Sequence, residues 1–206
     1  MAEVAAIVLA AGAARRYRAA DPSVISKLLV EFGGMAIVRR VVEAALASRA
    51  RPAIVVTGHA HTAIEAALDG LGVQFAFNAD HAAGLAASLK AGVALVPNHA
   101  SGAVVLLGDM PLVTPDLVDL LIDAFDAAPQ ASAVVPVFGG VRGNPVLLSR
   151  RLFPAVVQLS GDYGARKLIA GHADVIELEV AQDMVSLDID TPEALLEFQS
   201  RPEPAA

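Results

Sequence analysis

The chain has 206 residues, of which 55% are apolar and 18% charged, and its formal net charge is −7. The length suits one domain with one core, and the composition is globular, which excludes a disordered chain. The acidic charge and the 4% aromatic content disfavour a nucleic-acid surface, which needs basic and stacking side chains. Without cysteine, the chain has no disulfide, thiolate metal site or cysteine nucleophile.

The first residues do not have the pattern of a targeting signal. Residues 1–9 contain no basic segment, and their apolar run ends in a glycine turn followed by Arg15 and Arg16. No apolar stretch reaches the roughly 18 residues that span a bilayer. We therefore expect a cytoplasmic protein without a membrane partner.

Short apolar segments alternate with amphipathic ones along most of the chain. The apolar segments lack period-two alternation, as expected of parallel strands that are covered on both faces. The predicted strands are Val4–Leu9, Ala53–Thr57, Gln74–Phe77, Ala103–Leu107 and Ala133–Val137. The predicted helices between them are Met35–Ser48, His61–Leu68, Leu85–Val96 and Pro115–Ala127. This order predicts an α/β fold with a doubly wound, mostly parallel sheet.

The regular alternation of predicted strands and helices ends after the last of these strands. A glycine-rich segment at 139–143 precedes a strand at Pro145–Leu148, a helix near Ala165–Ala170 and a strand at Val175–Val180. We interpret them as a small α+β C-terminal lobe, followed by a last helix at Thr191–Gln199. Residues 1–200 are predicted to form a single domain, and residues 201–206 a flexible tail.

The first candidate site follows the first strand, because ligands of such sheets gather at the carboxyl ends of the strands. The small residues of Leu9–Gly12 let the main chain approach a ligand, and successive N–H groups can surround phosphate oxygens. Arg16 and Lys27 would add positive charge, although an ordinary turn with solvated arginines fits the same residues. The loop matches neither a Walker loop nor the three-glycine dinucleotide fingerprint, which counts against a nicotinamide enzyme.

The second candidate is Asp109, which closes the strand Ala103–Leu107. A carboxylate there is placed to hold a hard cation, since Mg²⁺ typically takes one or two carboxylates together with phosphate oxygens and water. An Asp that only caps the next turn is the alternative, but Thr114 and Pro115 already provide the next helix start. Asp188 and Asp190 share one side of an extended segment, so either can complete a metal site; a purely structural helix start is the simpler interpretation of that segment.

Three further loops carry polar residues that also fit ordinary turns. Gly84 and Ser88 stand at a predicted helix start, where free N–H groups can bind a phosphate or a base. The turn at 142–145 can present Asn144 to a second substrate, and the loop at 161–166 brings Arg166 to another helix start. His59 and His61 favour a helix start over a metal site.

In this order, the segments resemble the nucleotidyltransferases that act on the molybdenum cofactor. The matching residues are Leu9–Gly12, Arg16, Lys27, Gly84–Gly92, Gly108–Pro111, Arg142–Pro145, Gly161–Arg166 and Asp188–Glu193. The sequence Leu-Ala-Ala-Gly is closer to the cytidylyltransferase branch, since the guanylyltransferase branch tends to carry two glycines. Arg18 stands where the family has glycine, and an insertion separates it from Lys27.

The resemblance implies a Rossmann-like nucleotidyltransferase fold. It also implies the transfer of CMP from CTP to a phosphorylated acceptor, which would be molybdopterin or the molybdenum cofactor. It implies nucleotide contacts from Leu9, Ala10, Ala11, Gly12, Gly84, Ser88 and Gly108, catalytic roles for Arg16, Lys27 and Asp109, Mg²⁺ held by Asp109 and Asp190, and acceptor contacts from Arg142, Asn144, Gly164 and Arg166. It leaves room for contact with a molybdoenzyme or its chaperone.

Several alternatives share the predicted sheet. The same chemistry can use GTP with the pterin, or a sugar or polyol phosphate as acceptor. An NAD(P)H-dependent reductase and a non-catalytic binding or chaperone protein are alternatives of other classes. The carboxylates Asp109 and Asp190 favour catalysis.

Overall fold

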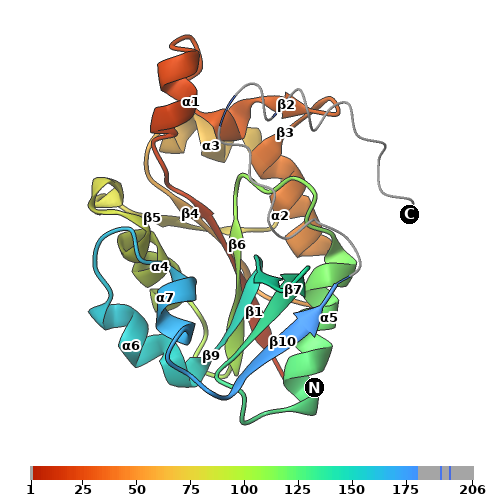
Figure 1. Ribbon diagram of the computed structural model, residues 1–206. Coiled ribbons are helices and arrows are strands. Elements are labelled where there is room, and N and C mark those ends of the chain that lie inside the picture. The colour runs from red at the N-terminus through yellow and green to blue at the C-terminus, as the bar shows by residue number, and fades with distance from the viewer. Residues whose placement is uncertain (1, 181–190, 192–194, 196–206) are drawn as a thin grey trace.

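The computed structural model describes residues 2–180 together with Thr191 and Leu195, and it is built around one large sheet (Figure 1). The sheet has eight strands in the order β10-β7-β9-β6-β1-β4-β5, with β8 paired to β7. The strands are β1 (Val4–Ala10), β4 (Ala53–Thr57), β5 (Gln74–Phe77), β6 (Gly102–Leu107), β7 (Ala133–Phe138), β8 (Val141–Arg142), β9 (Val146–Ser149) and β10 (Val175–Glu179). A separate antiparallel pair joins β2 (Glu31–Phe32) to β3 (Met35–Ala36).

Helices cover both faces of the sheet, which confirms the doubly wound α/β prediction. The α-helices are α1 (Arg15–Ala20), α2 (Ile37–Ala47), α3 (His61–Ala67), α4 (Leu85–Ala94), α5 (Pro115–Ala127), α6 (Phe153–Gln158) and α7 (Ala165–Ile169). Apolar residues of α2, α3 and α5 pack in one core cluster, and those of α4, α6 and α7 pack in the other. Three short 3-10 helices, η1 (Lys27–Leu29), η2 (His81–Ala83) and η3 (Arg150–Leu152), lie in the connections.

The central strand β1 shows why continuous apolar runs form this sheet. All seven of its residues are buried. Val4, Ala6 and Val8 face one core cluster, whereas Ala5 and Ile7 face the other. Strand β1 pairs in parallel with β4 on one side and with β6 on the other. A strand that is covered on both faces has no polar face, and this explains the absence of alternation in its sequence.

The C-terminal strands belong to the same sheet as the rest. Strand β9 runs antiparallel between β6 and β7, and β10 extends the sheet in parallel beyond β7. The segment predicted to form a small α+β lobe therefore completes the central sheet, with α6 and α7 against one face (Figure 1). The predicted helix 191–199, apart from Thr191 and Leu195, and the tail 201–206 lie outside the described residues.

The start of α2 differs from its prediction. Met35 and Ala36 were predicted to be helical but form β3, and the helix begins at Ile37. Gly33 and Gly34 both have positive φ, 60° and 76°, which lets the chain reverse tightly and pair Phe32 with Met35. The hairpin thus uses two residues that the apolar periodicity alone assigned to the helix. Among the described residues, no helix has the length and apolarity needed to cross a membrane.

Candidate nucleotide site

A cavity of about 510 Å³ lies at the carboxyl ends of β1 and β6. Its walls come from the loop after β1, from η1, from the segment between β5 and α4, and from the end of β6. The lining residues are Leu9, Ala11, Gly12, Ala13, Ala14, Tyr17, Lys27, Leu28, His81, Ala82, Gly84, Leu85, Ser88, Leu107, Asp109 and Asp162. The structure therefore brings most of the predicted nucleotide-binding residues to one place.

The backbone of β1 determines which residues of the first loop face this cavity. Leu9 O accepts a hydrogen bond from Gly108 N at 3.0 Å, and Ala11 O accepts one from His59 N at 3.1 Å. Ala10 is buried in the core and does not line the cavity. Beyond Gly12 the chain leaves the sheet, and Ala14 adopts a left-handed conformation just before α1. Residues 11–14 are thus the part of this loop that lines the cavity.

Lys27 and Asp109 form an ion pair in the wall of the cavity. Lys27 Nζ lies 2.7 Å from Asp109 Oδ2, and the two side chains are only 11% and 18% exposed. Helix η1 holds Lys27 in place, because the hydroxyl of Ser26 caps it by accepting a hydrogen bond from Leu28 N. The cavity wall therefore contains an ammonium–carboxylate pair in contact and partly shielded from water, in addition to the carboxylate of Asp162.

Asp109 could hold Mg²⁺ only if a bound ligand and water supplied the other oxygen atoms around the cation. Within the described residues, no three His, Asp or Glu side chains gather in a way that could hold a metal ion. Asp190, the predicted second metal ligand, lies outside the described residues, as does the side chain of Arg16 at the start of α1. A lone carboxylate together with phosphate oxygens and water nevertheless fits the usual coordination of Mg²⁺.

The start of α4 packs directly on the loop 161–164. Gly84 has a φ of 101°, and a Cβ there would stand 2.5 Å from the carbonyl group of Gly161. Gly161 O accepts a hydrogen bond from Ala86 N at 3.1 Å, and a Cβ at Gly164 would stand 2.6 Å from a methyl carbon of Leu85. The predicted nucleotide loop and the predicted acceptor loop are therefore one packed unit.

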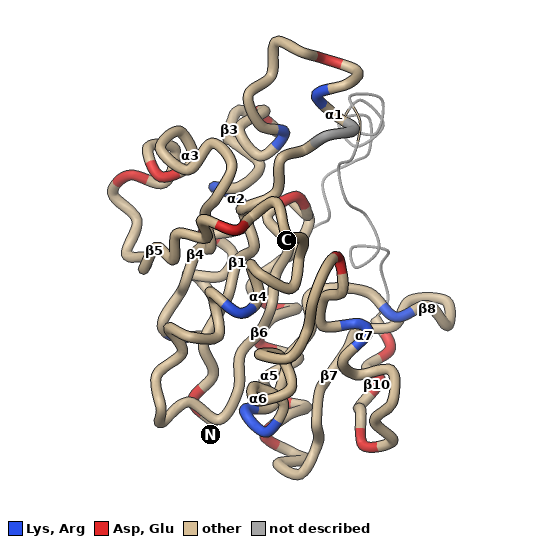
Figure 2. Tube along the Cα trace, turned by 90° about the vertical axis from the view of Figure 1, so that its left-hand side faces the viewer, with Lys and Arg blue, Asp and Glu red and all other residues tan. Residues whose placement is uncertain are grey.

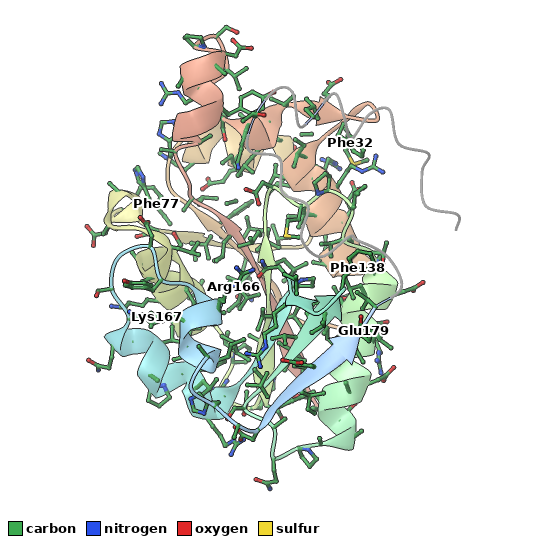
Figure 3. All side chains as sticks on the ribbon, viewed as in Figure 1. Phe32, Phe77, Phe138, Arg166, Lys167 and Glu179 are labelled. Atoms are coloured by element: carbon green, nitrogen blue, oxygen red, sulfur yellow. The ribbon has the colours of Figure 1, made fainter. Side chains whose placement is uncertain are left out.

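The predicted acceptor residues lie beside the cavity rather than in its wall. Arg142 Nε donates to Glu177 Oε1 at 2.7 Å, and an Arg166 terminal nitrogen donates to Arg142 O at 3.1 Å. Figure 2 shows these basic residues of β8 and α7 close together, and Figure 3 shows Arg166 reaching from α7 toward the strands. Asn144 precedes a cis peptide bond to Pro145. This cluster is a second polar surface next to the packed loops.

Comparison with known proteins decides the family. Residues 6–175 match the MobA-like NTP transferase domain. The chain belongs to this family. The resemblance stated from the sequence motifs is thereby confirmed.

Relatives of this MobA-like domain agree with the family assignment. It is 33% identical over 132 residues to the bifunctional protein GlmU of Sorangium cellulosum, covering 61% of this chain and 27% of that protein. It is 30% identical over 125 residues to the molybdenum cofactor cytidylyltransferase of Escherichia coli K12, covering 60% of this chain and 61% of that protein. The chain thus spans less than two thirds of the length of either relative.

Solved structures extend the likeness to nearly the whole MobA-like domain. Rv0371c from Mycobacterium tuberculosis H37Rv superposes with a TM-score of 0.83 at 29% identity, covering 97% of this chain and 99% of that chain. A second structure of Rv0371c is a complex with manganese, and it superposes with a TM-score of 0.77. A nucleotidyl transferase from Methanothermobacter thermautotroptrophicus superposes with a TM-score of 0.81, so the central sheet and its flanking helices have a nucleotidyltransferase-like fold.

Several cavity residues of the MobA-like domain were not among the predicted site residues. Tyr17 is buried in α1, and Leu28 follows Lys27 in η1. His81 and Asp162 lie in loops that the sequence had marked as polar, but without assigning a role to either side chain. His81 follows β5 and Asp162 precedes Gly164, and these positions beside predicted site residues were the only sequence signal for a role in the site. Nothing in the local pattern showed that the two loops meet.

Proposed function

We propose that this MobA-like domain transfers CMP from CTP to a phosphorylated pterin with the help of Mg²⁺, and that pyrophosphate is the second product. The observation that carries the proposal is the Lys27–Asp109 pair in the wall of a cavity bordered by the small residues after β1. The motif Leu9–Gly12 and the relationship to a cytidylyltransferase support cytidine over guanosine. The manganese complex of Rv0371c supports a divalent cation.

The proposed reaction needs positioning and charge neutralisation more than proton transfer. An ionised phosphate oxygen of the acceptor attacks the α-phosphorus in line and forms the new P–O bond. The bond from the α-phosphorus to the bridging oxygen breaks, and pyrophosphate leaves with that electron pair. The acceptor phosphate is already ionised, so the reaction requires no general base.

The residues of the cavity have separate roles in this proposal. The main chain of residues 11–14 would approach the nucleotide, and Lys27 and Arg16 would neutralise charge on the phosphates. Asp109, with Asp190, would hold Mg²⁺, which when bound supplies charge neutralisation and orientation of the α-phosphate. The surface of Arg142, Asn144 and Arg166 would contact the pterin.

Thermal unfolding with CTP, GTP, ATP, UTP and NADPH, each with and without Mg²⁺, tests this proposal. A ligand that binds only the folded state at 100 times its dissociation constant stabilises by about 2.7 kcal/mol, which is easily measured. We expect CTP with Mg²⁺ to give the largest shift. Asp109→Asn should lose the part of the shift that depends on Mg²⁺, whereas the control Asp69→Asn, at an exposed carboxylate outside the cavity, should keep it.

Two outcomes would contradict the proposal. A response to NADPH alone would point to a reductase on the same sheet. Full turnover by Asp109→Asn with CTP, Mg²⁺ and the pterin, measured as released pyrophosphate, would remove Asp109 from the metal site. A larger shift with GTP than with CTP would keep the chemistry and change the nucleotide.

A further inference from the structure

A buried hydrogen-bonded pair, Asn78 and Ser88, supports one wall of the cavity. Asn78 follows β5 and is 6% exposed, and Ser88 lies in α4 and is 5% exposed. Asn78 Nδ2 donates to Ser88 Oγ at 3.1 Å, and Asp80 N donates to Asn78 Oδ1 at 3.0 Å. Asn78 N also donates to Thr57 O at 2.8 Å, which fixes the residue to the end of β4.

These contacts determine the direction of the Asn78–Ser88 hydrogen bond. The backbone N–H of Asp80 can only donate, so the carbonyl oxygen of Asn78 must face it and the NH₂ group must face Ser88. The oxygen of Ser88 therefore accepts, and its own hydrogen is left for another acceptor. A serine in a helix often donates to the carbonyl four residues earlier, but within the described residues Ser88 makes no such bond to Gly84.

The cavity is the open direction for this hydroxyl hydrogen. Ser88 lines the cavity together with Gly84 and Leu85 of the same helix start. Buried polar groups are normally hydrogen-bonded to protein or to water, so a buried donor without an acceptor among the described residues is available to water or to a ligand that binds there. Such a ligand must present an acceptor atom, such as an oxygen of a nucleotide.

We propose that Asn78 is a positioning residue, which orients the Ser88 hydroxyl as a hydrogen-bond donor to an acceptor atom of the bound nucleotide. The inference rests on the proposed nucleotide function of the cavity. Asn78 acts through Ser88 and touches no ligand itself. Its second bond, from Asp80 N, also orders the start of the segment that carries His81 into the cavity wall.

Asn78→Asp reverses the direction of this hydrogen bond with little change of shape. One carboxylate oxygen still accepts from Asp80 N, but the other can only accept from Ser88. The hydroxyl hydrogen then turns to the carboxylate and leaves the cavity without its donor. Ser88→Ala removes the same donor directly, so both variants are expected to bind CTP with Mg²⁺ about five- to tenfold more weakly, as for one lost hydrogen bond.

The double variant separates this effect from charge repulsion between the nucleotide and the carboxylate introduced by Asn78→Asp. If both changes remove one and the same hydrogen bond, adding Asn78→Asp to Ser88→Ala causes little further loss of CTP affinity. Repulsion by the new carboxylate would instead multiply the two losses. Calorimetric titration of the full chain with CTP and Mg²⁺ measures all four affinities, and thermal unfolding without ligand checks that each variant is folded.

Lowering the pH provides a readout that a merely structural role would not change. Once protonated, the carboxyl group introduced by Asn78→Asp can again donate to Ser88, so the affinity of this variant relative to the wild type should recover as the pH falls through the carboxyl pKa. In the Ser88→Ala background this recovery should be absent. A recovery of equal size in both backgrounds would mean that relief of repulsion causes it, and would overturn the inference.

The remaining outcomes also decide the question. Failure of the wild type to bind any nucleotide overturns the proposed function and this inference together. Binding by the wild type with multiplied losses in the double variant overturns the inference alone. If Asn78→Asp does not fold, Ser88→Ala carries the test, and an unchanged CTP affinity in that variant overturns the inference.

Discussion

Replacing Lys27 by Met should strengthen the binding of a divalent cation in the absence of nucleotide. Lys27 Nζ is 2.7 Å from Asp109 Oδ2, so a cation that binds this carboxylate must either displace the ammonium group or bind against its repulsion. A hydrogen bond to a charged group has a net value of about 1.5–3 kcal/mol. Met keeps most of the apolar length of Lys and removes the ammonium group, together with this contact and the other interactions that the group makes. Converted at about 1.4 kcal/mol per tenfold, the expected gain in Mn²⁺ affinity is about 10- to 100-fold.

The same variant should bind CTP more weakly, because the proposed phosphate contact is lost with the ammonium group. In the wild type, a triphosphate that attracts Lys27 frees Asp109 for the cation, so each ligand should strengthen the binding of the other by the same factor. Mn²⁺ affinity measured by electron paramagnetic resonance, with and without CTP, tests both statements. Lys90→Met, at a lysine of α4 outside the cavity wall, is the matched control. An unchanged or lower affinity of Lys27→Met for Mn²⁺ alone would refute the reasoning.

Two further predictions concern stability. Gly92→Ala would place a Cβ 2.5 Å from Ile7 Cγ2 and 3.1 Å from Val56 Cγ2. Overpacking of this kind costs about 1–3 kcal/mol, whereas the higher helix propensity of alanine returns about 1 kcal/mol. Denaturant unfolding should therefore show a net loss of unfolding free energy, and the control Gly72→Ala, where no neighbouring atom lies within 4 Å of the Cβ position, should not share it. Ser132, which donates a hydrogen bond to Asp174, and the nearby Arg151 lower the pKa of Asp174 below its ordinary value of 3.8. This stabilisation is present above pH 3.8 and is lost as the pH falls through the lowered pKa. The stability difference between wild type and Asp174→Asn should therefore shrink in acid, and a difference independent of pH in thermal unfolding would contradict the assignment.

The sequence could predict the elements whose signal is local. The buried runs of β1, β4, β6 and β7 are long enough to stand out, and the start of α5 was predictable from Pro115 and from Thr114, whose hydroxyl accepts from Leu117 N. Strand β5 was also predicted, but at the edge of the sheet it leaves three of its four residues exposed and so is not covered on both faces. The position of β9 in the sheet could not be predicted from its sequence, because an apolar strand can pair with its neighbours in parallel or antiparallel orientation. Its antiparallel place between β6 and β7 depends on partners far away in the chain.

Helix α1, which carries Arg16 and Arg18, shows a different limit. Helix α1 is short, its start has no side-chain cap, and it follows Ala14 in a left-handed conformation, so neither periodicity nor capping predicts it. Its packing comes from Tyr17, which is buried against a small cluster with Phe32 and Ile37. A helix that is stabilised by distant residues leaves little trace in its own sequence.

Two glycines of the site differ in whether the packing of the protein requires them. A Cβ at Gly108 would stand 2.9 Å from Leu9 O, so the packing of β6 against β1 already requires a glycine there. At Gly12 no neighbouring atom of the described residues lies within 4 Å of the Cβ position, so the protein itself has room for a side chain. The described residues therefore give no packing reason for glycine at position 12. At Gly108, by contrast, packing alone requires glycine at the strand end from which Asp109 reaches the cavity.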